Sequence, residues 1–410
     1  MRISAKMSKR TKIVVVGGGP AGISVISGLR QWASRDKLQI TLLEPSDFHF
    51  YQSAWVNSAF ASKKDVSSRR HIGELLSPDD INWVNEAAGE FNPESNYVLT
   101  ETGLRVNYDY LVVACGLQID WEKIKGLHGK LGREGITSVA SYSTLNWTKN
   151  LFSKPRGKVI FTEPSTLCNM HSASKELVMR LQTKLSLNTH ETNSEITYYS
   201  GSHALYPVDA CQSVLKDRFK KNNIDWELSK ELIEVRPKAK IAVFRNLIDN
   251  TYFERHYDLL HIVPPMRAPV AVARSALADE VGLVDVDQHT LQHKKYSNIF
   301  AIGDISNTPV VRCISAIKMQ MPIVVSNIVT EILGAQPLKK YDGTSNQVIM
   351  VSEREAILFR CKFMRHMNLP FSYGLSESQV IGRLNLLSSM SYWRYLLSAN
   401  FSRIPFPDGR

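Results

Sequence analysis

Short apolar runs alternate with segments of helical character along most of this chain. Residues 12–16 form an apolar, β-branched run that stops at a glycine, which predicts a short buried strand. Residues 20–30 predict a helix, and residues 38–43 predict a second, mostly apolar strand. A strand, a helix and a strand at this spacing predict a βαβ unit with parallel strands.

The alternation continues further along the chain. More buried strands are predicted at 110–114, 157–162, 195–199 and 298–302, with another helix at 209–219. Beyond about Pro337 the alternation stops. The pattern therefore predicts an α/β protein with two Rossmann-like dinucleotide-binding-type domains and a C-terminal amphipathic membrane-associating region.

These segments suggest domain boundaries. Residues 1–150 and 251–336 are predicted to form one discontinuous domain. Residues 151–250 are predicted to form the second Rossmann-like domain, and residues 337–410 a separate C-terminal region.

Composition narrows the class of protein. With 43% hydrophobic and 22% charged residues in 410, a mainly disordered, collagen-like or coiled-coil protein is excluded. No run reaches the roughly 18 apolar residues of a spanning helix, which excludes a multi-pass membrane protein. The net charge of +11 favours an anionic partner, namely nucleic acid, an acidic membrane face or an anionic ligand. The chain has five cysteines and no CxxC, so we predict neither a metal site nor a secreted disulfide framework.

A glycine motif directly follows the first strand. Gly17, Gly18, Gly19 and Gly22 supply G-x-G-x-x-G at the start of a helix, where backbone N–H groups can face a pyrophosphate. Glu44 ends the second strand, where a carboxylate can accept hydrogen bonds from ribose hydroxyl groups. The motif therefore predicts a dinucleotide site.

A second pair of residues indicates which dinucleotide binds. Gly303 and Asp304 follow a late buried strand, as in two-dinucleotide flavoproteins, where the aspartate contacts the flavin chain. After the strand at 157–162, in contrast, no glycine fingerprint follows. We therefore expect residues 1–150 and 251–336 to form an FAD-binding domain, and we expect no use of NAD(P)H.

These features together resemble those of the mitochondrial-type sulfide:quinone oxidoreductases, and the chain looks like a divergent member of that family. The similarity covers nearly the whole chain. It includes the segments Glu44 to Ser46, His49 to Gln52 with Trp55, Tyr108 to Leu111, Gly116 to Asp120, Glu122 to Leu127, Leu232 to Arg236, His261 to Met266, Val284 to Asp287, Thr290 to Asp304 and Lys339 to Gly343.

The resemblance implies an activity and its partners. Members of this family oxidise sulfide with FAD and pass two electrons to ubiquinone, and the sulfur leaves on a small acceptor such as glutathione or sulfite. The resemblance adds Gln52 and Gly116 to the expected FAD-binding residues. It also implies that residues 337–410 form a C-terminal quinone and membrane region, with peripheral, monotopic attachment to the mitochondrial inner membrane.

The resemblance also implies a pair of active cysteines, one of which carries a persulfide. Cys168 lies in the loop after the second-domain strand and is the expected reactive thiol. The family's second cysteine directly follows the Gly-Asp pair, and here that position is Ile305. Cys313 lies eight residues further on, near a predicted helix start that would lower its pKa. Cys168 and Cys313 are therefore the candidate catalytic residues.

Both ends of the chain are basic. Residues 1–12 hold five Lys or Arg and no acid, which suits either the end of a mitochondrial presequence or a solvated basic tail. Residues 361–410 combine six Lys or Arg with interleaved aromatic residues, which is typical of helices that lie on a membrane surface. An ordinary helix packed on the sheet is the alternative. No nucleic-acid-binding motif occurs, so we expect no nucleic-acid partner.

Two main functional hypotheses follow. The first is an active FAD-dependent sulfide:quinone oxidoreductase. The second is a non-catalytic or repurposed relative that keeps the fold but lacks the second active cysteine, since Ile305 stands in its place. A type II NADH:quinone reductase is disfavoured because the second glycine fingerprint is missing.

Overall fold

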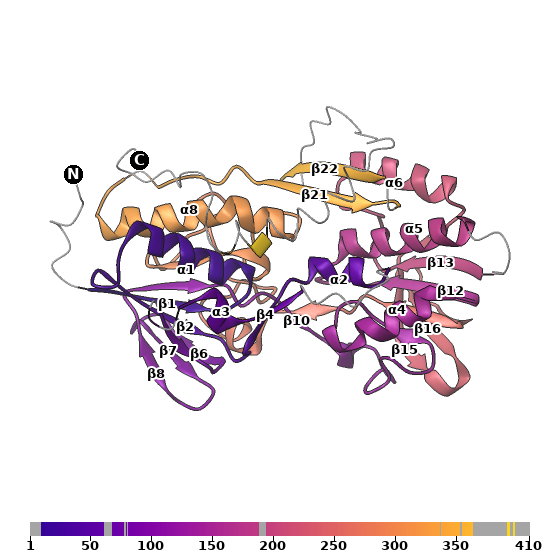
Figure 1. Ribbon diagram of the computed structural model, residues 1–410, viewed down its shortest axis with the longest axis horizontal. Coiled ribbons are helices and arrows are strands. Elements are labelled where there is room, and N and C mark those ends of the chain that lie inside the picture. Colours follow the sequence, from indigo (N-terminus) through magenta and orange to yellow (C-terminus); the bar gives the residue numbers. More distant parts are fainter. Residues whose placement is uncertain are drawn as a thin grey trace.

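Two parallel five-stranded sheets form the centres of two domains that lie next to each other (Figure 1). The computed structural model describes residues 10–60, 68–77, 79, 81–187, 194–336, 338–352, 355–363, 392, 393 and 397. Statements about side chains below refer to these residues.

The first sheet confirms the predicted βαβ unit. Its strand order is β20-β9-β1-β2-β5, and all neighbours are parallel. The strands are β1 (Thr11–Val16), β2 (Leu38–Leu43), β5 (Asn82–Val84), β9 (Tyr110–Val113) and β20 (Ile299–Ala301). The side chains of β1 are buried from Ile13 onward on both faces, which explains why the strand is a continuous apolar run.

Two helices cover one face of this sheet. They are α1 (Pro20–Trp32) and α8 (Ile314–Ile332), which pack against each other (Figure 1). Proline at the first position of α1 costs no hydrogen bond, because the N–H group of that position has no partner within the helix. The helix therefore begins directly at the end of the glycine turn.

The second sheet has the order β11-β18-β12-β13-β14 and is also parallel. Its strands are β11 (Ile136–Thr137), β12 (Gly157–Glu163), β13 (Ser194–Ser200), β14 (Asp225–Leu228) and β18 (Leu259–Ile262). The helices of this domain are α4 (Leu145–Ser153), α5 (His171–Leu187) and α6 (Asp209–Lys221). Two Rossmann-like sheets are therefore present, as predicted.

Strand pairing corrects the predicted domain boundaries. β11 and β18 belong to the second sheet, although the bounds at 150 and 251 assigned them to the first domain. The chain crosses between the domains at β10 (Gln118–Ile119) and β19 (Met266–Arg267), which pair antiparallel. The boundary was misplaced because β11 is only two residues long and has no strand signature.

Smaller elements complete the two domains. The antiparallel strands are β3 (Phe48–Phe50), β4 (Arg69–His71), β6 (Ala88–Asn92), β7 (Tyr97–Thr100), β8 (Arg105–Asn107), β15 (Lys230–Arg236), β16 (Ile241–Asn246) and β17 (Tyr252–His256). The short helices are α2 (Ser53–Ser58), α3 (Ile72–Leu75) and α7 (Val270–Ala273), with 3-10 turns at η2 (Trp121–Lys123), η3 (Tyr142–Thr144), η4 (Pro237–Ala239) and η5 (Gly303–Ile305).

A C-terminal hairpin bridges the two domains. Its strands β21 (Thr344–Met350) and β22 (Ala356–Lys362) pair antiparallel, and β21 contacts both α8 and α5 (Figure 1). The predicted C-terminal membrane region therefore begins with a hairpin that packs on the protein itself. The sequence argument missed it because a two-stranded hairpin leaves only a short alternating pattern.

Candidate functional site: the glycine turn and the Cys168 loop

The glycine motif forms the turn between β1 and α1. Gly17 has φ +106°, and a Cβ atom there would lie 2.6 Å from the Ala114 carbonyl oxygen. A Cβ atom on Gly22 would lie only 1.9 Å from the Gly17 carbonyl oxygen. Gly19, in contrast, has no atom within 4 Å of its Cβ position. The first and last glycines therefore permit close backbone packing, and the middle one borders open space.

Glu44 is fixed beside this turn. The N–H of Gly18 donates to Glu44 Oε2 over 2.6 Å, and the N–H of Ser46 donates to Oε1 over 2.8 Å. Burial raises the pKa of Glu44, and these two N–H donors oppose the shift. Each carboxylate oxygen keeps a lone pair that could accept a ribose hydroxyl.

The other expected FAD-binding residues fall into two groups. Gly116 and Gly303 both have positive φ, of 62° and 80°, and follow β9 and β20. Because β20, β9 and β1 are adjacent parallel strands, Gly303, Gly116 and Gly17 come from the same edge of the sheet. Asp304 is buried, which raises its pKa. Gln52 is exposed and directly precedes α2.

These residues fit FAD. The open space at Gly19 and Gly116 leaves room for a ligand at the carboxyl edge of the sheet, where open parallel sheets bind nucleotides. Gly17 to Gly22 would hold the pyrophosphate at the start of α1, and Glu44 would hold the ribose.

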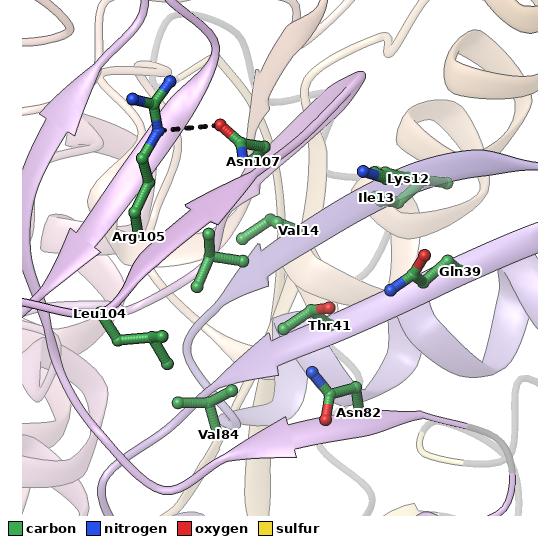
Figure 2. Close-up of a pocket in the computed structure, with 11 residues that line it drawn as sticks. Lys12, Ile13, Val14, Gln39, Thr41, Asn82, Val84, Leu104, Arg105 and Asn107 are labelled. Atoms are coloured by element: carbon green, nitrogen blue, oxygen red, sulfur yellow. Dashed lines mark hydrogen bonds between the residues drawn. The ribbon is translucent and has the colours of Figure 1, made fainter.

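A separate pocket lies at the opposite end of β1. Figure 2 shows its lining, which includes Lys12, Gln39, Asn82, Arg105 and Asn107, around a volume of about 220 Å³. Lys12 is near the amino end of β1, whereas the glycine turn follows the carboxyl end. The pocket is therefore not part of the dinucleotide site.

The Cys168 loop joins the two domains. Cys168 is 1% exposed, and its Sγ accepts a hydrogen bond from the N–H of Met170 over 3.2 Å. The next residue, Asn169, donates through Nδ2 to Asp304 Oδ2 over 2.9 Å. Burial, followed by the charge of Glu163, raises the pKa of Cys168 to about 12. The expected reactive thiol thus lies next to the Gly-Asp segment, and it is protonated at neutral pH.

A buried ionic network lies behind this loop. The carboxylate of Glu163 accepts hydrogen bonds from His171 Nδ1 at 2.8 Å, Ser174 Oγ at 2.5 Å, Lys175 and Tyr198. Burial alone would raise the pKa of Glu163, but Lys175 and His171 hold it well below its usual range. The sequence did not indicate this network, because Lys175, near the start of α5, belongs to no recognisable motif.

Arg312 is a second charged residue that the sequence did not reveal. Its Nε donates to the backbone oxygen of Asp304 over 3.2 Å. Its charge is within electrostatic reach of both Asp304 and Cys168, and burial lowers its pKa. Arg312 can therefore favour a thiolate or persulfide anion at Cys168.

The structure corrects the expectations for the second cysteine. Ile305 is fully buried in the core of the first domain, so residue 305 packs against apolar side chains. Cys313 does cap α8, and its Sγ accepts a hydrogen bond from the N–H of Ala316 at 3.3 Å. Its pKa is nevertheless raised to about 12, because burial outweighs the helix terminus. All five cysteines are outside disulfides.

Most of the predicted membrane-facing tail lies outside the described residues. The described exceptions are Tyr392, Trp393 and Leu397, which are at most 8% exposed and pack on the first domain. Tyr392 hydrogen-bonds His49 Nε2 and stacks on Tyr51. These three side chains therefore pack on the protein, and for the rest of the tail membrane contact stays a prediction. In the described part of the chain, no helix is long and apolar enough to cross a membrane.

Comparison with known proteins places this site in a family. Residues 11–151 match the family model described as pyridine nucleotide-disulphide oxidoreductase. The mitochondrial sulfide:quinone oxidoreductase of Dictyostelium discoideum is 34% identical over 405 residues, covering 97% of this chain and 88% of that protein.

Two solved structures share the fold over almost the whole chain. The sulfide:quinone oxidoreductase of Aquifex aeolicus has a TM-score of 0.80 at 20% identity, with 97% and 93% of the two chains covered. A chain of the Tetrahymena thermophila mitochondrial ATP synthase has a TM-score of 0.82 at 18% identity, with 97% and 98% covered. From the sequence identity and coverage together, this chain belongs to the sulfide:quinone oxidoreductase family, whose members use FAD and a quinone acceptor.

Proposed function

We propose that this chain oxidises sulfide with FAD and passes the electrons to ubiquinone at the mitochondrial inner membrane. The observation that carries the proposal is the contact between Asn169 and Asp304, which brings the Cys168 loop to the flavin-binding segment. The mitochondrial location rests on the names of the relatives. When bound, FAD would accept the two electrons that sulfur oxidation releases.

We propose Cys168 as the residue that carries the sulfur. In the structure both thiols are free, so the cycle would begin with loss of two electrons, to FAD when it is bound, and two protons, which joins Cys168 and Cys313 in a disulfide; hydrosulfide would then attack that disulfide. The bond between the two protein sulfurs breaks, a persulfide forms on Cys168, and Cys313 leaves as a thiolate. The N–H of Ala316, which donates to Cys313 Sγ, would stabilise that thiolate, and the charge of Arg312 would stabilise the persulfide anion. Glutathione or sulfite would then remove the outer sulfur.

The experiment is anaerobic addition of sulfide and a soluble quinone to the FAD-loaded protein. Flavin bleaching by sulfide and its reversal by quinone are expected. Cys168→Ala should abolish the bleaching, whereas Cys211→Ala, a matched change at another buried cysteine, should leave it intact. Bleaching of equal rate in Cys168→Ala would refute the assigned role.

A second candidate is a relative without sulfide oxidation. It is favoured by the raised pKa of both Cys168 and Cys313, because protonated thiols are poor nucleophiles. The fold alone does not decide between the two candidates, because a chain of a mitochondrial ATP synthase has the same fold. Bound FAD that sulfide does not bleach would favour this second candidate.

A further inference from the structure

Two cysteines outside the proposed active site are in direct contact. Cys211 lies in the first turn of α6 and Cys361 near the end of β22, and they are 0% and 1% exposed. Their thiols share a hydrogen bond. Neither residue belongs to a motif, and they are far apart in the sequence, so only the fold brings them together.

Contacts on both sides of the two cysteines hold α6 against β22. The ring of Tyr206, just before α6, packs on Phe359 of β22 with 5.3 Å between centroids. At the other end of the contact, Arg218 and Glu355 form an ion pair at 2.5 Å. The two thiols therefore lie between two contacts that join α6 to the hairpin.

The hairpin is also fastened to α5. Ser172 Oγ donates to Gln347 Oε1 over 2.6 Å, and the N–H of Met350 donates to Glu176 Oε2 over 3.2 Å. Since β22 pairs with β21 along its whole length, Cys361 cannot move away from Cys211 without disturbing both strands. A bond between the two sulfurs would bring them to about 2.05 Å from each other.

We propose that Cys211 and Cys361 are a second redox site, a dithiol that a peroxide converts into a disulfide. The disulfide would fasten the C-terminal hairpin to α6 of the second domain. This site is independent of the proposed sulfide chemistry, because it uses neither Cys168 nor the flavin-binding edge.

The two thiols have unequal roles. Cys211 donates its hydrogen bond to Cys361, which lowers the pKa of Cys361 and raises that of Cys211. Cys361 therefore gives up its proton more readily than Cys211 and is the nucleophile that attacks one peroxide oxygen. The O–O bond breaks, Cys361 becomes a sulfenic acid, and the other oxygen leaves as hydroxide, which takes up the proton that Cys361 released to form water.

The second step closes the disulfide. The Cys211 thiol attacks the sulfenic sulfur of Cys361, and the departing hydroxide takes up the proton of Cys211 to form a second water. Two thiols are thus oxidised by two electrons, and one peroxide is reduced to two waters. A small neutral oxidant is required because both sulfurs are buried.

The test starts from the reduced, full-length protein. Hydrogen peroxide is added, remaining thiols are alkylated, and digested peptides are identified by mass spectrometry. A cross-linked peptide that joins Cys211 to Cys361 is expected, together with a higher Tm than that of the reduced protein, since the cross-link restricts the unfolded chain. Cys211→Ser and Cys361→Ser should each abolish the Tm increase, and Cys115→Ser should retain it.

The wild-type measurement decides the question even if a variant folds poorly. Recovery of both cysteines as alkylated thiols after peroxide would overturn the proposal. A cross-link from Cys361 to Cys313 would also overturn it; Cys313 is near enough that the charge of Cys361 raises its pKa.

Discussion

Removal of Lys175 would test the buried network behind the Cys168 loop. Lys175 and Glu163 have side chains that are 0% and 1% exposed, and their charges pair directly. In Lys175→Met the apolar stem is retained and the charge is lost. Glu163 then keeps His171 as its other basic partner, and that side chain is 25% exposed.

The expected loss of stability is large. Breaking a buried ion pair by removing one partner costs about 3–5 kcal/mol, which is roughly two to four powers of ten in the unfolding constant. In the double variant Lys175→Met/Glu163→Gln neither residue of this ion pair carries a charge, so the loss of stability should be clearly smaller. Lys220→Met, at an exposed lysine of α6, should change stability by at most about 0.5 kcal/mol.

The pH dependence gives a second readout. In the wild type the pKa of Glu163 is lowered in the folded protein. The carboxylate therefore stabilises the fold at any pH above its ordinary pKa of 4.5, and this stabilisation is lost as the pH falls through the lowered pKa. Without Lys175, burial favours the protonated acid, so the deficit of the variant should grow as the pH rises from about 4.5 to 7.

Urea unfolding followed by circular dichroism measures these differences. The series compares the two Lys175 variants and the Lys220 control at pH 5 and pH 7. A midpoint for Lys175→Met equal to that of Lys220→Met at pH 7 would refute the reasoning. So would a double variant that is less stable than Lys175→Met.

Three further predictions concern the site. Gly22→Ala should prevent folding, because its Cβ would lie 1.9 Å from the Gly17 oxygen, whereas Gly19→Ala should fold and bind less FAD, as measured by circular dichroism and flavin absorbance. Burial lowers the pKa of His49 to about 4, so His49 should reduce the stability of the fold as the pH falls from 6.5 towards 4. In a His49→Gln variant the free energy of unfolding should fall less steeply over this pH range, and an unchanged slope would contradict the reasoning. Alkylation of Cys168 by iodoacetamide at pH 7 should be about a hundredfold or more slower than that of an unperturbed thiol and should still be rising at pH 10, which peptide mass spectrometry can follow; a plateau near pH 9 would rule out the raised pKa.

Local patterns predicted the elements whose burial is continuous. The strand β1 was visible because four apolar residues follow one another, and β2 because four of its six residues are apolar. The glycine turn was visible because its spacing is fixed. β11 could not be predicted, since two residues carry no period.

The candidate site could be predicted only in part. Cys168 and Asp304 were found separately, but their link through Asn169 spans 135 positions and depends on packing between domains. The pKa of Cys313 was predicted to fall because only its helix terminus was visible in the sequence. Burial, which reverses the direction, is a property of the folded chain.

The strand order has a consequence for synthesis of the protein on the ribosome. All five strands of the second sheet lie between β11 and β18, so that sheet can close as one contiguous unit. The first sheet needs β20, which is made only after the second domain is complete. Until then β9 is an open edge, able to pair with foreign strands. This edge therefore stays unpaired by β20 while more than a hundred further residues are added, which is the stage of synthesis at which mispairing of the first sheet is expected.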